Sequence, residues 1–308
     1  MSSRRSSSKG VFVFVLGAVL AAALAIHGLI PTTYGLALVV ETLLPWTWVL
    51  LVFLALLTLI RLSWFSVAGL LIPCLVWGSM FGAFLRPASP PEDPDLLVAT
   101  HNVGARLPQP TATAHSIIDQ EPDIVAIQEI ESLSGQIITE ELSEAYPHAR
   151  KVESVGVWSK WPMTPPEEYT LGMQWTRAFA TTISTDHGDI RFYAVHLPSV
   201  RPGHESLRNT GLEQLADVIA ADDAERIVVA GDFNTSYSDR YFAELDAMLE
   251  DTRQATGGGF GYTWPAILPV TRLDHIMVGG ALEPVGDEVL DRGTSDHRAV
   301  IGSIDLVE

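Results

Sequence analysis

Six short polar motifs in the second two-thirds of the chain carry side chains that can bind a metal ion and phosphate. They supply carboxylates, amides and imidazoles, and each lies at the end of a hydrophobic run. The six are Thr100-His-Asn-Val103, Gln128-Glu129, Val195-His-Leu197, Gly231-Asp-Phe-Asn234, Arg272-Leu-Asp-His275 and Ser295-Asp-His-Arg298. Several strand ends can converge at one sheet edge on one metal ion and one phosphate. The motifs therefore predict a divalent-metal phosphohydrolase.

The carboxylates are the candidates for holding a cation and for activating water. A phosphate ester repels hydroxide, so a hard cation with oxygen ligands must neutralise it. Glu129 follows the apolar run 124–127 directly and is the best single metal ligand. Asp232 and Asn234 alternate along an extended segment, so both face one side. An ordinary turn or a calcium loop is the alternative for Asp232 and Asn234, but the further acids of a calcium loop are missing.

Two histidines are the candidates for binding phosphoryl oxygens or protonating a leaving group. Imidazole does both near neutral pH, and His196 and His297 each lie in one of the motifs. Asp274 could orient His297, as a third group orients a catalytic base. His101 is left out of the site, because alternation sends its side chain away from that of Asn102 and into the sheet. His275, next to Asp274, is interpreted as a packed or structural histidine.

Short strands alternate with helices in the segment that carries the motifs. Apolar runs predict buried strands at 96–99, 124–127, 190–195, 227–230, 276–278 and 299–304. Helical spacing of apolar residues predicts helices at 112–120, 137–145, 206–222 and 239–250. This mixture favours an α+β sandwich with strand layers inside and helices outside.

The first 86 residues have the composition of a transmembrane region. Apolar runs predict spans at about 11–30, 44–60 and 63–85, with an interfacial helix at 34–44. A cleaved signal peptide is the alternative for the start of the chain, but two more apolar runs follow it. Basic residues before and after the first two spans predict a multi-pass cell-membrane protein with a cytoplasmic N-terminus and an extracytoplasmic C-terminal domain. A Pro-rich linker, 87–95, separates this region from the domain at 96–308.

In order and chemistry the motifs resemble the endonuclease/exonuclease/phosphatase superfamily, over residues 96–306. The resemblance is specific because Gly231-Asp-Phe-Asn234 and Ser295-Asp-His297 occur together near the C-terminus. It implies a four-layer α/β/β/α sandwich and a Mg²⁺ cofactor, with Mn²⁺ or Ca²⁺ as alternatives. The implied metal-binding residues are Asn102, Glu129 and Asp296. The resemblance implies that Asp232 activates water and that Asp274 orients His297. It implies that Asn234, His196 and His297 contact phosphate.

The charge of the chain constrains the identity of the substrate less than the motifs constrain the reaction. After Arg86 the chain holds 14 bases and 36 acids, a net charge of −22, and only two lysines. Nucleic-acid binding normally needs lysine and arginine against phosphates. Arg177 and Arg208 could still line a substrate pocket. The expected substrate is a phosphoester, with a lipid headgroup, a small molecule or nucleic acid as its source, and the sequence indicates no protein partner.

Two alternatives stay open at this point. One is an endonuclease that acts on extracytoplasmic nucleic acid, since a bound metal ion can recruit phosphate by itself. The other is a catalytically silent membrane receptor or scaffold that kept the sandwich. Silent relatives usually lose one or more of the acids and histidines, whereas every expected position is filled here.

Overall fold

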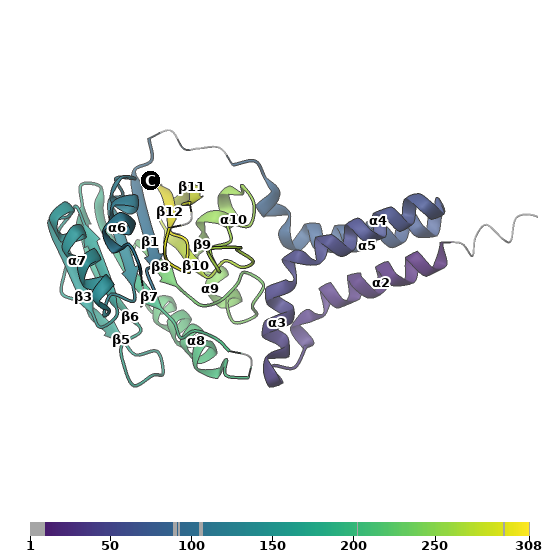
Figure 1. The fold of residues 1–308 in the computed structure, drawn as a ribbon, viewed down its shortest axis with the longest axis horizontal. Coiled ribbons are helices and arrows are strands. Elements are labelled where there is room, and N and C mark those ends of the chain that lie inside the picture. The colour runs from purple at the N-terminus through teal and green to yellow at the C-terminus, as the bar shows by residue number, and fades with distance from the viewer. Residues whose placement is uncertain are drawn as a thin grey trace, which may run out of the picture. The chain divides into compact units, whose positions relative to one another are not determined.

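The computed structural model describes residues 10–88, 91, 93–104, 107–201, 203–291 and 293–307 (Figure 1). The chain divides into two compact units. The first comprises the described residues up to Ala83, together with short segments at 201–204 and 238–240. The second comprises nearly all the remaining residues, and we call it the sandwich unit.

Apolar helices make up the first unit. They are α2 (Val11–Ala25), α3 (Leu36–Leu43), α4 (Trp48–Arg61) and α5 (Trp64–Phe81). Glycines allow α2 and α5 to pack closely, because a Cβ atom on Gly17 would lie 1.7 Å from the carbonyl oxygen of Gly69. A pair of serines caps α5: Ser63 accepts from Ser66 N, and Ser66 Oγ accepts from Ser63 N.

The helices differ from the three predicted spans. Among the described residues, one helix, Trp64–Leu85, is long and apolar enough to cross a membrane by itself. The segments Thr33–Leu43 and Pro45–Arg61 meet the same test only as a pair, which is bent by 58° at Pro45. The predicted first span, 11–30, is a shorter helix that ends at Ala25. Gly28 and Pro31 follow it, and both residues disfavour continuation of an α-helix.

Residues Phe84–Arg86, at the end of the predicted membrane region, group by their contacts with the sandwich unit. The Phe84 ring lies 4.6 Å from the Tyr237 ring and 5.2 Å from the Phe260 ring. Arg86 donates hydrogen bonds to the carbonyl oxygens of Gln254 and Ala255. The predicted linker 87–95 lies partly outside the described residues, which omit 89, 90 and 92.

Two six-stranded sheets form the centre of the sandwich unit. The first has the order β11-β12-β1-β2-β4-β3, and the second has the order β5-β6-β7-β8-β10-β9. Strands of the first sheet are β1 (Leu96–Asn102), β2 (Ile124–Gln128), β3 (His148–Val152), β4 (Val155–Ser159), β11 (Leu282–Val289) and β12 (Val300–Leu306). Strands of the second are β5 (Glu167–Tyr169), β6 (Ala178–Thr185), β7 (Gly188–His196), β8 (Arg226–Asp232), β9 (Glu250–Asp251) and β10 (Asp274–Gly280).

Helices cover both outer faces, which confirms the predicted α+β four-layer sandwich. On the first sheet lie α6 (Pro110–Ile118) and α7 (Leu133–Ala145) (Figure 1). They pack against Ala99, Val125 and Ile127. On the second sheet, α8 (Ser206–Ala220) and α9 (Ala243–Asp246) pack against strands β7, β8 and β10. A short helix, α10 (Thr252–Thr256), follows β9. Between the sheets lies a third apolar core with Val98, Ile124, Phe192, Val228 and Ile276 among its members.

Strand alternation brings the polar motifs to one end of this inner core. Side chains two residues apart face the same side of a strand. In five strands the inward-facing positions are apolar along most of the strand and polar at one end, with Thr100 also polar in β1. The five polar residues are Asn102, Gln128, His196, Asp232 and Asp274. Within the sheets Asn102 is paired with Gln128, and Asp232 is paired with both His196 and Asp274. The fold thus concentrates these polar side chains at one end of the core.

A buried ion network supports the segment that leads into β10. The Asp287 side chain has no exposed surface and accepts hydrogen bonds from Arg253 and from both terminal nitrogens of Arg272. Arg272 lies two residues before Asp274 and also donates to the carbonyl oxygen of Gly261. This network therefore fixes the backbone from which Asp274 projects.

Replacement of Asp287 by asparagine should destabilise the sandwich unit strongly. Removal of one partner leaves two buried guanidinium groups uncompensated, which costs about 3–5 kcal/mol. Thermal unfolding of the purified chain should then occur roughly 10 °C lower. The matched control is Glu288→Gln at the exposed neighbouring position, which should leave the midpoint nearly unchanged. Equal midpoints for the two variants would contradict the assignment of this network as a support.

Candidate active site

The residue at the centre of the polar cluster is Asp232, at the end of β8. Gly231 before it is required by close packing, since a Cβ atom there would lie 1.9 Å from the carbonyl oxygen of Val195. Asp232 Oδ2 accepts from Asn102 Nδ2 at 2.9 Å, and its Oδ1 accepts from the backbone N–H of Asn234 at 2.8 Å. Burial, together with the negative charge of Asp274, raises the pKa of Asp232 to about 7. A carboxylate with such a pKa can accept a proton near neutral pH.

Asp274 and His297 form a hydrogen-bonded pair beside Asp232. His297 Nδ1 lies 2.9 Å from Asp274 Oδ2, and its Nε2 lies 3.9 Å from Asp232 Oδ2. Burial lowers the pKa of His297, but the charges of Asp274, Asp232 and Asp296 outweigh burial and raise it to about 10. The imidazole is therefore protonated at neutral pH, and its Nε2–H can donate to a bound oxygen.

Oxygen ligands for a cation gather next to this pair. Asn102 Nδ2 also donates to Glu129 Oε1 at 3.2 Å, so this amide bridges Glu129 and Asp232. The exposed Asp296 carboxylate lies beside Gly104, because a Cβ atom there would be 3.1 Å from Asp296 Oδ1, and the Gly104 N–H donates to Asn102 Oδ1. The carboxylates of Glu129, Asp232 and Asp274 thus lie around Asn102 and His297. Such an excess of carboxylate oxygens fits a hard divalent cation.

Glu129 and Asn234 both adopt backbone angles that side-chain-bearing residues rarely use. Their φ angles are +66° and +50°, in the left-handed region. Such strain persists only where the surroundings enforce it, and it is concentrated at functional sites.

A second grouping offers an alternative metal position. Asp232, Asp274 and His297 each present one ligand atom within 4.8 Å of one another. Within this grouping Asp274 Oδ2 already pairs with His297 Nδ1 at 2.9 Å, so the same three residues can also hold and move a proton.

A cavity of about 500 Å³ opens beside the cluster. Glu129, His196, Trp175 and Arg177 are among the residues that line it. The guanidinium of Arg177 lies 5.1 Å from the Trp175 ring centroid, and burial lowers its pKa although four nearby carboxylates oppose this. Among the described residues its buried Nε has no hydrogen-bond partner, so the guanidinium is available to an anion in the cavity.

His196 lies at the inner end of this cavity as a neutral imidazole. Burial, and then the positive charge of Arg177, lowers its pKa to about 4. Ser154 Oγ lies 3.3 Å from His196 Nδ1. A hydrogen bond donated by Ser154 would leave Nε2 as the protonated nitrogen, directed toward Glu129 Oε1 at 3.9 Å. Sequence reasoning missed Ser154, because it lies in the turn between β3 and β4 and belongs to no motif.

Three predicted residues make contacts that differ from their predicted roles. Asn102 donates from Nδ2 to Glu129 and Asp232, and its Oδ1, the atom that would bind a cation, accepts from Gly104 N at 3.0 Å. Asn234 Nδ2 donates to Asp232 and to the carbonyl oxygen of Leu197, so in this arrangement it orients Asp232 rather than phosphate. Arg208 is 2% exposed and donates to Thr235 Oγ1. It is absent from the residues that line the cavity and supports the loop after Asp232. His101 and His275 are buried and hydrogen-bonded to backbone carbonyls, as expected of structural histidines.

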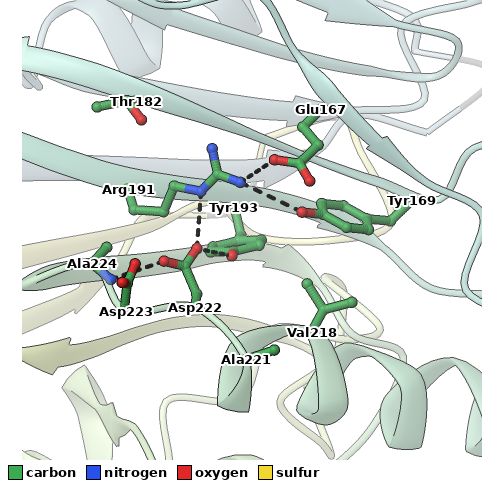
Figure 2. A pocket seen from close by; sticks show the side chains of 10 residues that line it. All are labelled: Glu167, Tyr169, Thr182, Arg191, Tyr193, Val218, Ala221, Asp222, Asp223 and Ala224. Carbon is green, nitrogen blue, oxygen red and sulfur yellow. Dashed lines mark hydrogen bonds and ion pairs between the residues drawn. The ribbon is translucent and has the colours of Figure 1, made fainter.

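A second cavity, of about 580 Å³, lies over the end of α8 and the outer face of β7. Figure 2 shows Arg191 between the carboxylates of Glu167 and Asp222, with which it forms ion pairs. Tyr193 also donates to Asp222. The cation of this cavity is already neutralised by its neighbours, so we assign the chemistry to the cluster around Asp232.

Comparisons with known proteins agree with this geometry. Residues 99–297 match the model of the Endonuclease/Exonuclease/phosphatase family. A humanized TDP2 from D. rerio is 18% identical, with a TM-score of 0.59 over 68% of this chain and 98% of that chain. An endonuclease/exonuclease/phosphatase from Beutenbergia cavernae DSM 12333 is 21% identical, with a TM-score of 0.53 over 70% of this chain and 72% of that chain. A further structure, D. rerio TDP2 complexed with a single-strand DNA product, is 18% identical and has a TM-score of 0.58 over 68% of this chain and 98% of that chain. No curated protein matches the chain.

Proposed function

Because the chain belongs to the endonuclease/exonuclease/phosphatase family, we propose that it is a divalent-metal-dependent phosphoesterase. The observation that carries the proposal is the convergence of Asn102 and Asp232 from opposing sheets, 2.9 Å apart, beside the Asp274–His297 pair. The residues proposed to hold Mg²⁺ are Glu129, Asn102 and Asp296, with Mn²⁺ or Ca²⁺ as alternative ions. When bound, the cation supplies positive charge that neutralises the phosphate oxygens.

The residues of the chain have complementary roles in the proposed hydrolysis. Asp232 accepts a proton from the attacking water, and the amides of Asn102 and Asn234 hold its carboxylate in place. His297 donates from Nε2 to a phosphoryl oxygen or to the leaving group, and Asp274 keeps it charged and oriented. His196 is a neutral imidazole whose Nδ1 carries no proton, so its Nε2–H donates to a second phosphoryl oxygen.

We also propose that the N-terminal region anchors the enzyme in a membrane. The helix Trp64–Leu85 has the length and hydropathy for a span, and α2, α3 and α4 are apolar as well. The multi-pass arrangement and the extracytoplasmic position of the sandwich unit stay predictions from the basic residues. A membrane-held phosphoesterase has phospholipid headgroups and small phosphoesters within reach.

A nuclease activity is the second candidate. It is favoured by the fold shared with a TDP2 structure that contains a single-strand DNA product. The charge of −22 after Arg86 opposes it, because a DNA backbone needs a basic surface. We therefore rank small or lipid phosphoesters above nucleic acid.

Replacement of Glu129 by glutamine should weaken metal binding. Glutamine keeps the size and one oxygen but removes the negative charge that attracts the cation, so the Kd for Mn²⁺ should rise on the order of 100-fold. Titration of the purified chain followed by electron paramagnetic resonance of free Mn²⁺ measures this directly. The control is Glu141→Gln in α7, which should bind Mn²⁺ as the unchanged chain does. Unaltered binding in Glu129→Gln would place the cation elsewhere.

Replacement of Arg177 by glutamine should raise KM about tenfold or more, because a charge-assisted hydrogen bond to a substrate phosphate would be lost. The kcat should change less, since Arg177 lies in the cavity rather than at Asp232. Lys151→Gln, at an exposed position of β3, is the matched removal of one positive charge. If both variants raise KM equally, only long-range attraction is involved and the direct contact is refuted.

The experiment that tests the proposed function is a comparison of substrates with the full chain in detergent. Bis(4-nitrophenyl) phosphate, phospholipid in mixed micelles and single-stranded DNA are each incubated with Mg²⁺ and with chelator. We expect turnover that the chelator abolishes and that restored Mg²⁺ recovers. Turnover that persists in chelator, or no turnover by a folded chain that binds Mn²⁺, would refute the metal-dependent phosphoesterase.

A further inference from the structure

A short loop beside the active site presents apolar side chains to its surroundings. Residues 264–270 read Trp-Pro-Ala-Ile-Leu-Pro-Val and contain no charge or polar side chain apart from the indole N–H, and we call them the apolar loop. Ile267 and Leu268 are 72% and 71% exposed, and Trp264 is 37% exposed. A contiguous exposed apolar patch marks a surface that binds an apolar partner.

The apolar loop is held in this exposed form by its own backbone. Its base is closed by hydrogen bonds from Thr263 N and Trp264 N to the carbonyl oxygen of Thr271, at 2.9 and 3.0 Å. Val270 N donates back to the carbonyl oxygen of Trp264 at 2.9 Å, and a turn joins Leu268 N to Pro265 O at 3.1 Å. A tip that is already ordered can enter a partner with little further loss of conformational freedom.

The apolar loop is also bonded to both neighbours of His297. Ala266 N donates to the carbonyl oxygen of Asp296 at 2.7 Å, and Arg298 N donates to the carbonyl oxygen of Thr263 at 3.0 Å. The Arg298 side chain donates in addition to the carbonyl oxygen of Ala266. Whatever covers Ile267 and Leu268 is therefore fixed next to the group that contacts phosphate.

The chemistry of the apolar loop selects its partner. A nucleic-acid strand would need cations, whereas the loop carries none and the chain after Arg86 has a net charge of −22. The same chain carries the helix Trp64–Leu85, which is apolar enough for a bilayer. A bilayer offers hydrocarbon to Ile267 and Leu268, and its interface accommodates an indole such as that of Trp264.

We propose that Ile267 and Leu268 insert into the bilayer that holds the chain, so that the site acts on phosphoesters of membrane lipids. This inference deepens the proposed function and rests on it for the reaction. Insertion of the loop does not depend on turnover, so an experiment can refute insertion without refuting the proposed phosphoesterase activity, and the reverse.

Insertion is tested with a fluorescent probe in the full chain reconstituted in vesicles of phosphatidylcholine and phosphatidylglycerol. Cys74 is the only cysteine, so Cys74→Ser with Leu268→Cys allows one environment-sensitive fluorophore at the tip. Emission should shift to the blue and be quenched by lipids that carry a nitroxide on the acyl chain. Leu133→Cys in the same background is the control, because Leu133 is 76% exposed on α7. A tip probe that behaves as this water-exposed control would overturn the proposal.

The substrate class is tested with the double substitution Ile267→Ser with Leu268→Ser. Hydrolysis of phospholipid in the vesicles should fall about tenfold or more, because the apolar anchor is lost. Hydrolysis of soluble bis(4-nitrophenyl) phosphate should stay within about twofold. Leu133→Ser should change neither rate.

Other results would overturn the lipid assignment. Equal losses on both substrates would mean that the apolar loop only supports His297. A selective loss on single-stranded DNA would assign the loop to nucleic acid, and a smaller oligomer in sedimentation without probe burial would assign it to a second copy of the chain. Absence of all turnover in the unchanged chain would refute the proposed function and the substrate class, while the probe would still decide insertion.

Discussion

Substitution of Asp232 by asparagine is expected to lower phosphodiester turnover about a thousandfold. Asparagine has nearly the same volume, and its oxygen can still accept from the Asn102 and Asn234 amides, but its NH2 group then faces the Asn234 N–H and it cannot accept a proton from water. The loss of that one hydrogen bond is opposed by the loss of a charge that disfavours folding at neutral pH, because burial and Asp274 raise the pKa of Asp232, so the unfolding midpoint should change little. The measurement pairs kcat with the thermal unfolding midpoint of the same sample.

The control for this substitution is Asp246→Asn. Burial also raises the pKa of Asp246, but this residue lies in α9, outside the cluster. Its kcat should equal that of the unchanged chain. A value of kcat in Asp232→Asn above roughly a tenth of the unchanged rate would remove Asp232 from the proton transfer.

Loss of either member of the Asp274–His297 pair is expected to lower kcat by about two to four orders of magnitude. Asp274 keeps His297 charged and fixes its ring through the 2.9 Å hydrogen bond, so each residue acts through the same imidazolium. Asp274→Asn combined with His297→Gln should therefore cost little more than His297→Gln alone. If the two losses multiply, the residues act independently and the proposed pair is wrong.

The chain contains a matched control for this pair. Asp251 and His275 are also 2.9 Å apart and have no exposed side-chain surface. His275 follows Asp274 on β10, so alternation sends its side chain to the opposite face of the sheet. Asp251→Asn should lower the unfolding midpoint without changing kcat per folded molecule, which separates a structural pair from a catalytic one.

The sequence predicted the centre of the site because polar residues there continue buried apolar strands. Asp232 and His196 end runs of Val, Ile, Phe and Ala, and period-two alternation carries their side chains to the inner face. Sheet pairing then sets Asp232 between His196 and Asp274, which no local pattern specifies. The predicted strands were found, although β1, β8 and β10 extend further into the polar motifs than the apolar runs indicated.

Features without an apolar signature were missed. Strand β3 reads His-Ala-Arg-Lys-Val, and its polar residues hide it from a pattern of buried runs. Trp175 lies outside any helix or strand, so its stacking with Arg177 depends on a tertiary contact. The predicted helix 239–250 contains only the short helix Ala243–Asp246. In the N-terminal region, composition indicated three spans, but a bend at Pro45 and the early end at Ala25 depend on local backbone geometry.

The central claim is metal-assisted attack of water on phosphorus, and an isotope experiment tests it most directly. The full chain hydrolyses bis(4-nitrophenyl) phosphate in ¹⁸O-enriched water with Mg²⁺, and mass spectrometry locates the label. We predict one ¹⁸O atom in the 4-nitrophenyl phosphate and none in the 4-nitrophenol that is released. In the presence of chelator we predict no labelled product. Label in the nitrophenol, or no hydrolysis by a folded chain that binds the metal ion, would contradict the proposed function.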